Sequence, residues 1–143
     1  MEVKIKKLDE RAVIPSYAHV GDAGMDVTAV SVNITDDYIE YGTGLAFQLP
    51  KNHVMLIFPR SSNSKKDLLL CNSVGVLDST YVGELKLRFK ITNQDKSRDN
   101  KIYSIGDRVG QIMILPYPTI QLKEVDELEE TERGDSGFGS TGV

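Results

Sequence analysis

One acidic residue of the sequence, Asp78, stands in a setting that suits general-base chemistry. It lies in the segment Asn72 to Glu84, which contains two glycines and, three positions after the acid, Tyr81. Such a segment predicts a β-hairpin with Asp78 near its rim, whose backbone N–H and C=O groups could face the edge of a ligand. There the carboxylate could serve as a general base.

Three other segments combine charged or hydroxyl side chains with turn residues. Ala23 to Val27 is a glycine turn that enters a strand, and an acid at such a place is more often a turn residue than a ligand. Pro59 to Ser64 follows an apolar run, so its arginine and hydroxyls suit an anion site and equally a helix cap with a surface arginine. Gly106 to Gln111 predicts a turn before a buried strand, where an ion pair between its neighbouring Asp and Arg explains the charges as well as ligand contact does.

The last segment, Arg133 to Val143, packs four glycines, two serines and a threonine around Phe138. This composition is typical of a disordered terminus. One arginine and one aromatic ring among small hydroxyl residues also suit a flap that binds phosphate and stacks on a base. The stretch before it, Gln121 to Arg133, has six acidic residues against two basic ones, which predicts a solvated segment rather than core.

The elements that must position these segments are strands. Apolar residues alternate with cationic ones from Glu84 to Ile91, which indicates a strand with one buried face. Glycine and proline punctuate the chain at short intervals, so the sequence predicts an all-β barrel or sandwich. A short helix is expected only at Ser62 to Leu69. Further strands are predicted at Gly44 to Leu49, Val54 to Phe58 and Gln111 to Leu115.

Length and composition narrow the class of protein. The 143 residues suit one domain, and 40% hydrophobic with 27% charged residues is the balance of a globular chain, not a disordered one. The single cysteine, Cys71, cannot form an internal disulfide, which fits a reducing, intracellular compartment. A net charge of −4 argues against binding to nucleic acid, and no apolar run approaches the ~20 residues of a membrane-spanning helix.

In their order and spacing the five segments resemble those of the trimeric deoxyuridine triphosphatases (dUTPases, or dUTP pyrophosphatases). The resemblance runs from Ala23 to Gly142 and depends most on GVLDSTYVGE and RGDSGFGSTG, with PRSS between the first and third segments. It implies an all-β subunit of β-clip or distorted jelly-roll type, residues 1–143 forming a single domain. It further implies a homotrimer in which residues 117–132 form an arm over a neighbouring subunit and residues 133–143 a flexible tail that closes the site.

The reaction that the resemblance implies is hydrolysis of dUTP to dUMP and pyrophosphate, with Mg²⁺ held mainly by the triphosphate oxygens. Asp78 looks like the base that orients and deprotonates water for in-line attack on the α-phosphorus. Tyr81 looks like the residue beneath the deoxyribose, and Asn72 with the backbone of Gly75, Val76 and Leu77 like the reader of the uracil edge.

The phosphates and the metal are assigned by the same resemblance. Asp26 matches a position linked to the metal through water, while Arg60 and Arg108 more plausibly brace the site through ion pairs than touch substrate. Phe138 would stack on uracil and Arg133 would clamp the γ-phosphate. The remaining substrate-binding positions are Ser61, Ser62, Gln111, Gly139, Ser140 and Thr141.

Two other functions stay open at this point. A dCTP deaminase, or a bifunctional deaminase–pyrophosphatase, shares the fold but would need a second acid or base beside Asp78. A trimer that binds nucleotide without catalysis is the other. The compartment is expected to be the cytoplasm, with the nucleus or a virus-infected cell left open. The chain departs from the family pattern at Asn63, Thr80, Val82, Gly110 and Ser136.

Overall fold

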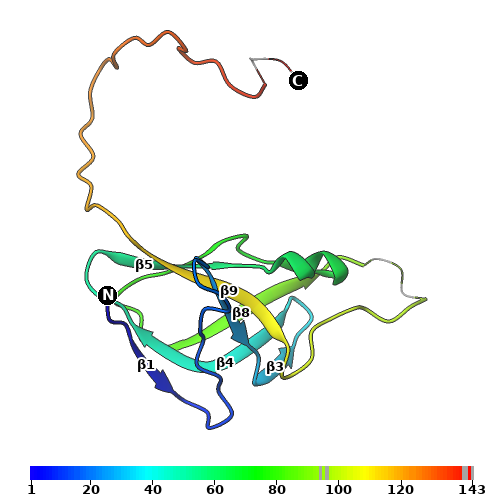
Figure 1. Cartoon of the computed structure of the whole chain (residues 1–143). Helices are drawn as coiled ribbons and strands as arrows, with labels where there is room; N and C mark the ends of the chain where they lie inside the picture. Colours follow the sequence, from blue (N-terminus) through cyan, green and yellow to red (C-terminus); the bar gives the residue numbers. More distant parts are fainter. Residues whose placement is uncertain (94, 96, 140–141, 143) are drawn as a thin grey trace.

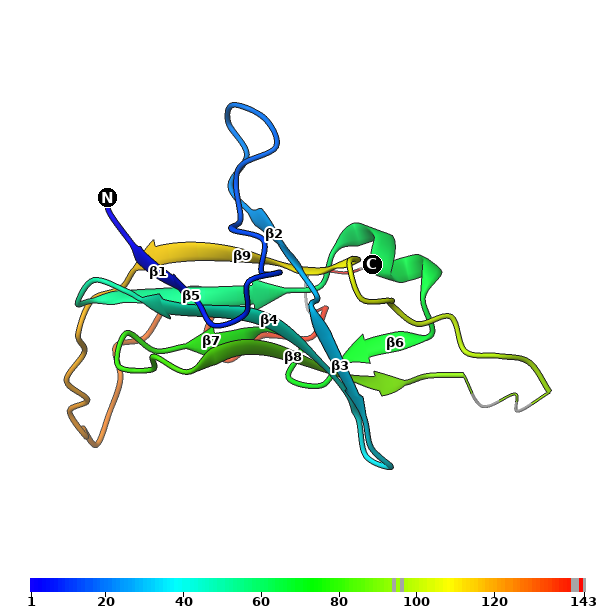
Figure 2. The same cartoon turned by 90° about the horizontal axis from the view of Figure 1, so that it is seen from below.

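The computed structural model of the chain describes residues 1–93, 95, 97–139 and 142. The described residues form two antiparallel sheets that pack against each other, as Figures 1 and 2 show. The first sheet has the order β1-β4-β8-β6, with β3 also paired to β4, and the second has the order β2-β9-β5-β7. The strands are β1 (Lys4–Lys7), β2 (Met25–Thr28), β3 (Ser31–Ile34), β4 (Ile39–Gln48), β5 (His53–Phe58), β6 (Leu68–Leu70), β7 (Gly75–Leu77), β8 (Glu84–Ile91) and β9 (Arg108–Pro116).

The core lies between the two sheets and contains residues from both. In β8 the predicted alternation is confirmed, because Leu85, Leu87 and Phe89 are buried while the lysines and the arginine between them face outward. Tyr41 packs edge-on against both Phe89 and Tyr103, and the rings of Phe89 and Tyr103 are tilted toward each other, with ring centroids 5.8–5.9 Å apart in all three pairs. The predicted strands Val54 to Phe58 and Gln111 to Leu115 lie within β5 and β9, and Gly44 to Leu49 overlaps the second half of β4. The all-β class is confirmed.

Two expectations about local structure are wrong. The segment expected to be a helix contains a 3₁₀ helix, η1 (Ser61–Lys65), and then the strand β6, which pairs with β8. Without a side-chain cap or an acidic residue in its first turn, η1 has little to extend it. The segment Asn72 to Glu84 is not a hairpin, since β7 pairs with β5 in one sheet and β8 belongs to the other. A buried leucine decides each outcome, because Leu70 pairs with Phe89 in the first sheet and Leu77 pairs with Met55 in the second.

Gly110 fits a close approach between the sheets. A Cβ atom at this position would collide with the side chain of Leu87 and lie 3.1 Å from the carbonyl oxygen of Phe58. In this chain the glycine at position 110 therefore leaves room for the side chain of Leu87.

The chain after β9 leaves the body. Figure 1 shows it as an arc from the end of β9. The Tyr117 N–H donates to the Asn52 carbonyl at 2.9 Å, and residues 117–139 contain no strand or helix and are all exposed. Across the described ranges, no helix is long and apolar enough to cross a membrane.

Candidate functional site

One carboxylate holds two arginines together where β2, β5 and β9 meet. Asp26 lies opposite Gln111 in the pairing of β2 with β9. Its Oδ1 accepts a hydrogen bond from Arg60 Nε at 2.9 Å, and its Oδ2 lies 3.1 Å from Arg108 Nη1. The arginine at position 108 thus pairs with Asp26, whereas its neighbour Asp107 accepts from the Ser104 N–H. We call Asp26, Arg60 and Arg108 the Asp26 cluster; its charges sum to +1, which suits an anion.

The predicted hydroxyl and amide residues gather beside the Asp26 cluster. Arg60 Nη1 donates to Ser62 Oγ at 3.0 Å, and Gln111 Nε2 donates to the Pro59 carbonyl at 3.0 Å. These bonds fix the start of η1, where Ser61 is exposed. The structure therefore brings Asp26, Ser61, Ser62 and Gln111 together at one end of the second sheet.

Two residues that fix η1 in place, one of them within it, were not singled out as functional in the sequence. Asn63 Nδ2 donates to the Leu68 carbonyl at 2.8 Å, and the Tyr103 hydroxyl donates to Asn63 Oδ1 at 3.0 Å. Burial raises the pKa of Tyr103, so its hydroxyl stays a donor at neutral pH. The only available signal was an amide at position 63, where the family often has an aliphatic residue.

A cavity of about 460 Å³ lies around β7 and the start of β8. Its lining includes Asn72, Asp78, Tyr81 and Glu84. The Tyr81 N–H donates to the Asp78 carbonyl at 3.0 Å, and its hydroxyl donates to the Glu84 carbonyl at 2.9 Å. The ring lies so close over Gly83 that a Cβ there would be 2.6 Å from the Tyr81 oxygen. We call this cavity the Asp78 pocket.

The outer wall of the Asp78 pocket is a charge network on the first sheet. Glu40 accepts from Arg88 Nε at 2.7 Å and from Lys86 Nζ at 3.1 Å. Burial alone would raise the pKa of Glu40, but its hydrogen bonds to these two cations hold that pKa below its ordinary value. Asp78 itself is exposed, and among the described residues no side chain hydrogen-bonds to its carboxylate.

The Asp78 pocket and the Asp26 cluster are far apart within one copy of the chain. Leu77 pairs with Met55, so Asp78 lies at the level of Val54, six residues before Arg60. With a rise of about 3.3 Å per residue, the backbone of Asp78 is about 20 Å from that of Arg60. The cavity around Asp78 shares no lining residue with either of the two grooves that border the Asp26 cluster.

The C-terminal residues lie apart from both. Phe138 is fully exposed, and Arg133 Nε donates to the Ser136 carbonyl at 3.0 Å. Ser136 does not have a positive φ, so the serine at this departure is unstrained. Gly139 belongs to the same exposed segment, whereas Ser140 and Thr141 lie outside the described residues.

Comparison with known proteins decides the family. A family model described as dUTPase matches residues 10–142. A deoxyuridine 5'-triphosphate nucleotidohydrolase of Corynebacterium glutamicum is 38% identical, over 98% of this chain and 94% of the relative. One of Clostridium novyi is 40% identical over all of both chains. The chain belongs to the dUTPase family. It is therefore an enzyme, a hydrolase of nucleotide metabolism, as the sequence predicted.

Solved dUTPase structures agree with the fold. A dUTPase of Staphylococcus bacteriophage 80alpha, solved with dUpNHpp, has a TM-score of 0.83 and 28% identity and covers 99% of both chains. A G164S mutant of the same phage dUTPase, also with dUpNHpp, has a TM-score of 0.82 and 28% identity, again over 99% of both chains.

Asp26 is the residue that the resemblance to dUTPases links to a metal. In the described part of the chain no group of three His, Cys, Asp or Glu side chains could hold an ion. A carboxylate accepts about four hydrogen bonds, and the two arginines leave acceptor positions on Asp26 free for a metal-bound water. This donor set suits Mg²⁺ that arrives with phosphate oxygens, because Mg²⁺ keeps several waters and takes few protein carboxylates.

Proposed function

We propose that this dUTPase-family enzyme hydrolyses dUTP to dUMP and pyrophosphate in sites that are completed between three copies of the chain. The separation of about 20 Å between Asp78 and the Asp26 cluster carries the proposal, because a catalytic base must reach the reacting atom directly or through one water. The names of the curated relatives and the dUpNHpp-bound phage dUTPases support dUTP as the substrate.

The nucleoside would bind in the Asp78 pocket of one copy. The Tyr81 ring, held by its two hydrogen bonds, would lie beneath the deoxyribose and leave no room for a 2′-hydroxyl. Asn72 and the backbone of Gly75, Val76 and Leu77 would read the uracil edge. Gly75 allows this approach, since a Cβ there would lie 2.9 Å from Ile57 and 3.2 Å from the Asn72 amide.

The triphosphate would bind at the Asp26 cluster of a second copy. Ser61, Ser62 and Gln111 would donate hydrogen bonds to phosphate oxygens. Arg60 would keep its ion pair with Asp26 and act mainly by its charge and by holding Ser62 in place. Mg²⁺, bound to the phosphates and reached by Asp26 through water, would neutralise phosphate charge.

The Asp78 carboxylate would orient and deprotonate the water that attacks the α-phosphorus in line, with pyrophosphate as the leaving group. The tail of a third copy would close the site. Its Arg133 would bind the γ-phosphate and its Phe138 would stack on uracil, with Gly139, Ser140 and Thr141 beside the phosphates. Exposure of the described tail residues in one copy supports this assignment.

One assay tests the proposed function. Pyrophosphate release is measured with dUTP, dTTP, dCTP and UTP, and ammonia release is measured with dCTP. We expect pyrophosphate from dUTP far above the other three and no ammonia. Ammonia from dCTP would establish a deaminase instead, and tight dUTP binding without pyrophosphate would establish a non-catalytic trimer. Light scattering should give three times the chain mass of 15.9 kDa.

A further inference from the structure

A basic groove runs beside the Asp26 cluster, away from the Asp78 pocket. It is open, has a volume of about 740 Å³ and lies between η1 and the segment before β9. One acid, Asp107, is in its lining. The cations in the lining are Arg60, Lys65, Lys66, Lys101 and Arg108.

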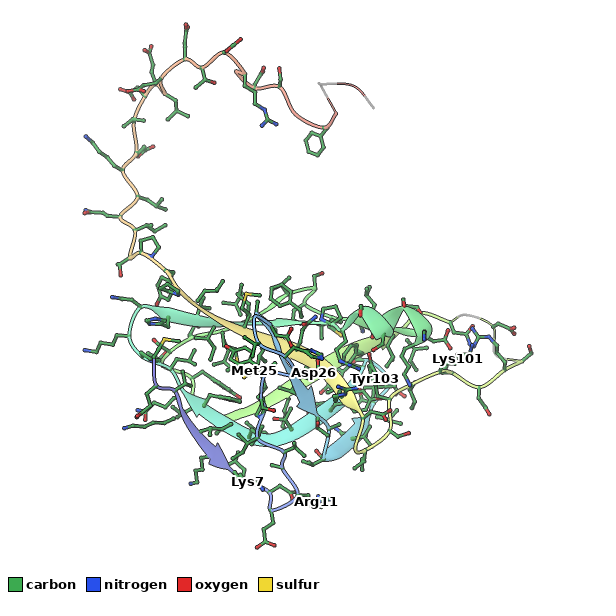
Figure 3. The ribbon with its side chains drawn as sticks, viewed as in Figure 1. Lys7, Arg11, Met25, Asp26, Lys101 and Tyr103 are labelled. Carbon is green, nitrogen blue, oxygen red and sulfur yellow. The ribbon has the colours of Figure 1, made fainter. Side chains whose placement is uncertain are left out.

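The groove is held in shape by hydrogen bonds. Lys66 Nζ donates to the Ile102 carbonyl at 3.0 Å and lies 4.9 Å from the centre of the Tyr103 ring. The Asp67 carboxylate accepts hydrogen bonds from both terminal nitrogens of Arg98, at 2.9 and 3.0 Å, and from the Lys101 N–H at 2.7 Å. These bonds tie the Lys101 segment to η1. Figure 3 shows Asp26, Tyr103 and Lys101 following one another along the body.

Two of the lysines in the basic groove have charges that no described carboxylate neutralises. Among the described residues, neither Lys65 nor Lys101 forms an ion pair with a carboxylate. When Asp26, the partner of both arginines, is counted with the lining, the basic groove has a net charge of +3. The cavity around Asp78 contains two cations and three acids, and the groove on the other side of Asp26 contains one cation and two acids. Of these three, only the basic groove attracts an acidic segment.

The arm supplies such a segment. Residues 124–132, the acidic segment, contain six acids and no base, and every one of them is exposed. The arm follows Pro116, which lies at the opposite end of β9 from Arg108 and the basic groove. At about 3.3 Å per residue, the sixteen residues 117–132 span up to about 50 Å, which is enough to cross the body of another copy.

The position of the acidic segment follows from what comes after it. Glu132 directly precedes Arg133, which the proposed function places at the γ-phosphate beside Ser61 and Ser62. The residues before Arg133 must then pass along a rim of that site. The basic groove shares Ser62 with the site and is the rim whose charge is opposite to theirs.

We propose that the acidic segment of one copy docks in the basic groove of a neighbouring copy and thereby places the tail over the site. This inference rests on the proposed function. Lys65 and Lys101 are then docking residues for the arm and not contacts of the substrate. Because the attraction is between exposed charges, closure of the tail should weaken as salt rises.

Charge reversal in both partners tests the docking. The chain contains no tryptophan, so Phe138→Trp gives a single fluorescent reporter of tail closure. In this background, Lys65→Glu/Lys101→Glu reverses two charges of the basic groove, and Glu129→Lys/Glu130→Lys reverses two charges of the acidic segment. A further protein combines all four substitutions. Lys7→Glu/Lys90→Glu is the control, because it makes the same change in charge at exposed lysines outside the groove. Closure is titrated with a non-hydrolysable dUTP analogue and Mg²⁺ at low and high salt.

Exposed ion pairs each change an equilibrium constant by up to about fivefold, so each reversal should weaken closure by about tenfold at low salt. The combined protein should regain most of that loss, the control should match the parent, and kcat at saturating dUTP should change little. Equal closure in the groove reversal and the control, or no recovery in the combined protein, would overturn the docking. A wild-type chain that releases no pyrophosphate from dUTP would instead refute the proposed function.

Discussion

The body, residues 1–116, and the arm that follows it differ in what holds them. The body places apolar residues of two sheets in one core, with Tyr41, Leu45 and Phe89 fully buried. In the arm, Leu122 and Leu128 are 89% and 86% exposed. Apolar side chains left in water contribute nothing to folding of their own chain. Stability therefore resides in the body, whereas the arm has its part in the proposed function only where it meets another copy.

Within the body, changing Asp78 to Asn separates catalysis from folding most strongly. The amide keeps the shape of the carboxylate but cannot take a proton, so kcat should fall by about 10²–10⁴-fold while dUTP binding and thermal stability are kept. Steady-state kinetics and calorimetry measure both. Asp36→Asn, at another exposed acid, is the control and should behave as wild type. A D78N enzyme with more than about a tenth of the wild-type kcat argues against the assignment.

Removal of residues 133–143 takes away a segment whose described residues, 133–139 and 142, are all exposed. The thermal midpoint should not change, because Phe138 and its described neighbours are exposed. Activity should fall by about 10²-fold or more, since the charge of Arg133 would be lost from the phosphates. Asp135→Ala in the full-length chain is the control for changes in the tail. Near-normal turnover by the shortened enzyme would mean that the tail is not part of the site.

The same substitution in each region sharpens the contrast in stability. Gly110→Ala places a methyl group against Leu87 and should destabilise the protein by about 1–3 kcal/mol. Gly137→Ala adds the same methyl group where no atom lies within 4 Å, and should change stability little. Denaturant unfolding compares the two variants. Adding Leu87→Val to Gly110→Ala should recover part of the loss, and equal effects at positions 110 and 137 would contradict the assignment of the core.

The smallest expected effect is on the pH dependence of the body. Hydrogen bonds from Arg98 and from the Lys101 N–H lower the pKa of Asp67 from 3.8 to about 2. The folded-state pKa is depressed, so this carboxylate stabilises the fold above about pH 4 and loses that contribution as the pH falls toward 2. Asp67→Asn should be less stable than wild type at pH 6, and the difference should shrink between pH 4 and pH 2 in thermal melts. A constant difference over that range would show that the ion pair with Arg98 is not the cause.

Local pattern predicted the long strands β5, β8 and β9 but missed β1, β3 and β6, and it did not give the strand partners. Alternation alone gives the bounds of β8, because one face of that strand is buried and the other is cationic. It could not show that β6 and β7 join different sheets, since three-residue strands carry too little periodicity to specify a partner. Ion pairs of Arg60 and Arg108 were expected, but their shared partner was not, because Asp26 in β2, Arg60 before η1 and Arg108 in β9 are distant in sequence.

The most direct test of the central claim, that each site is shared between copies, is complementation between two inactive variants. Asp78→Asn and the chain lacking residues 133–143 are co-expressed in equal amounts, and pyrophosphate release by the mixed trimers is measured. If Asp78 and the tail of one site come from different chains, random assembly leaves about a quarter of the sites with both intact, and about a quarter of the wild-type activity should return. Activity no higher than that of the two variants measured separately would contradict the account, because it would place Asp78 and the closing tail in the same chain.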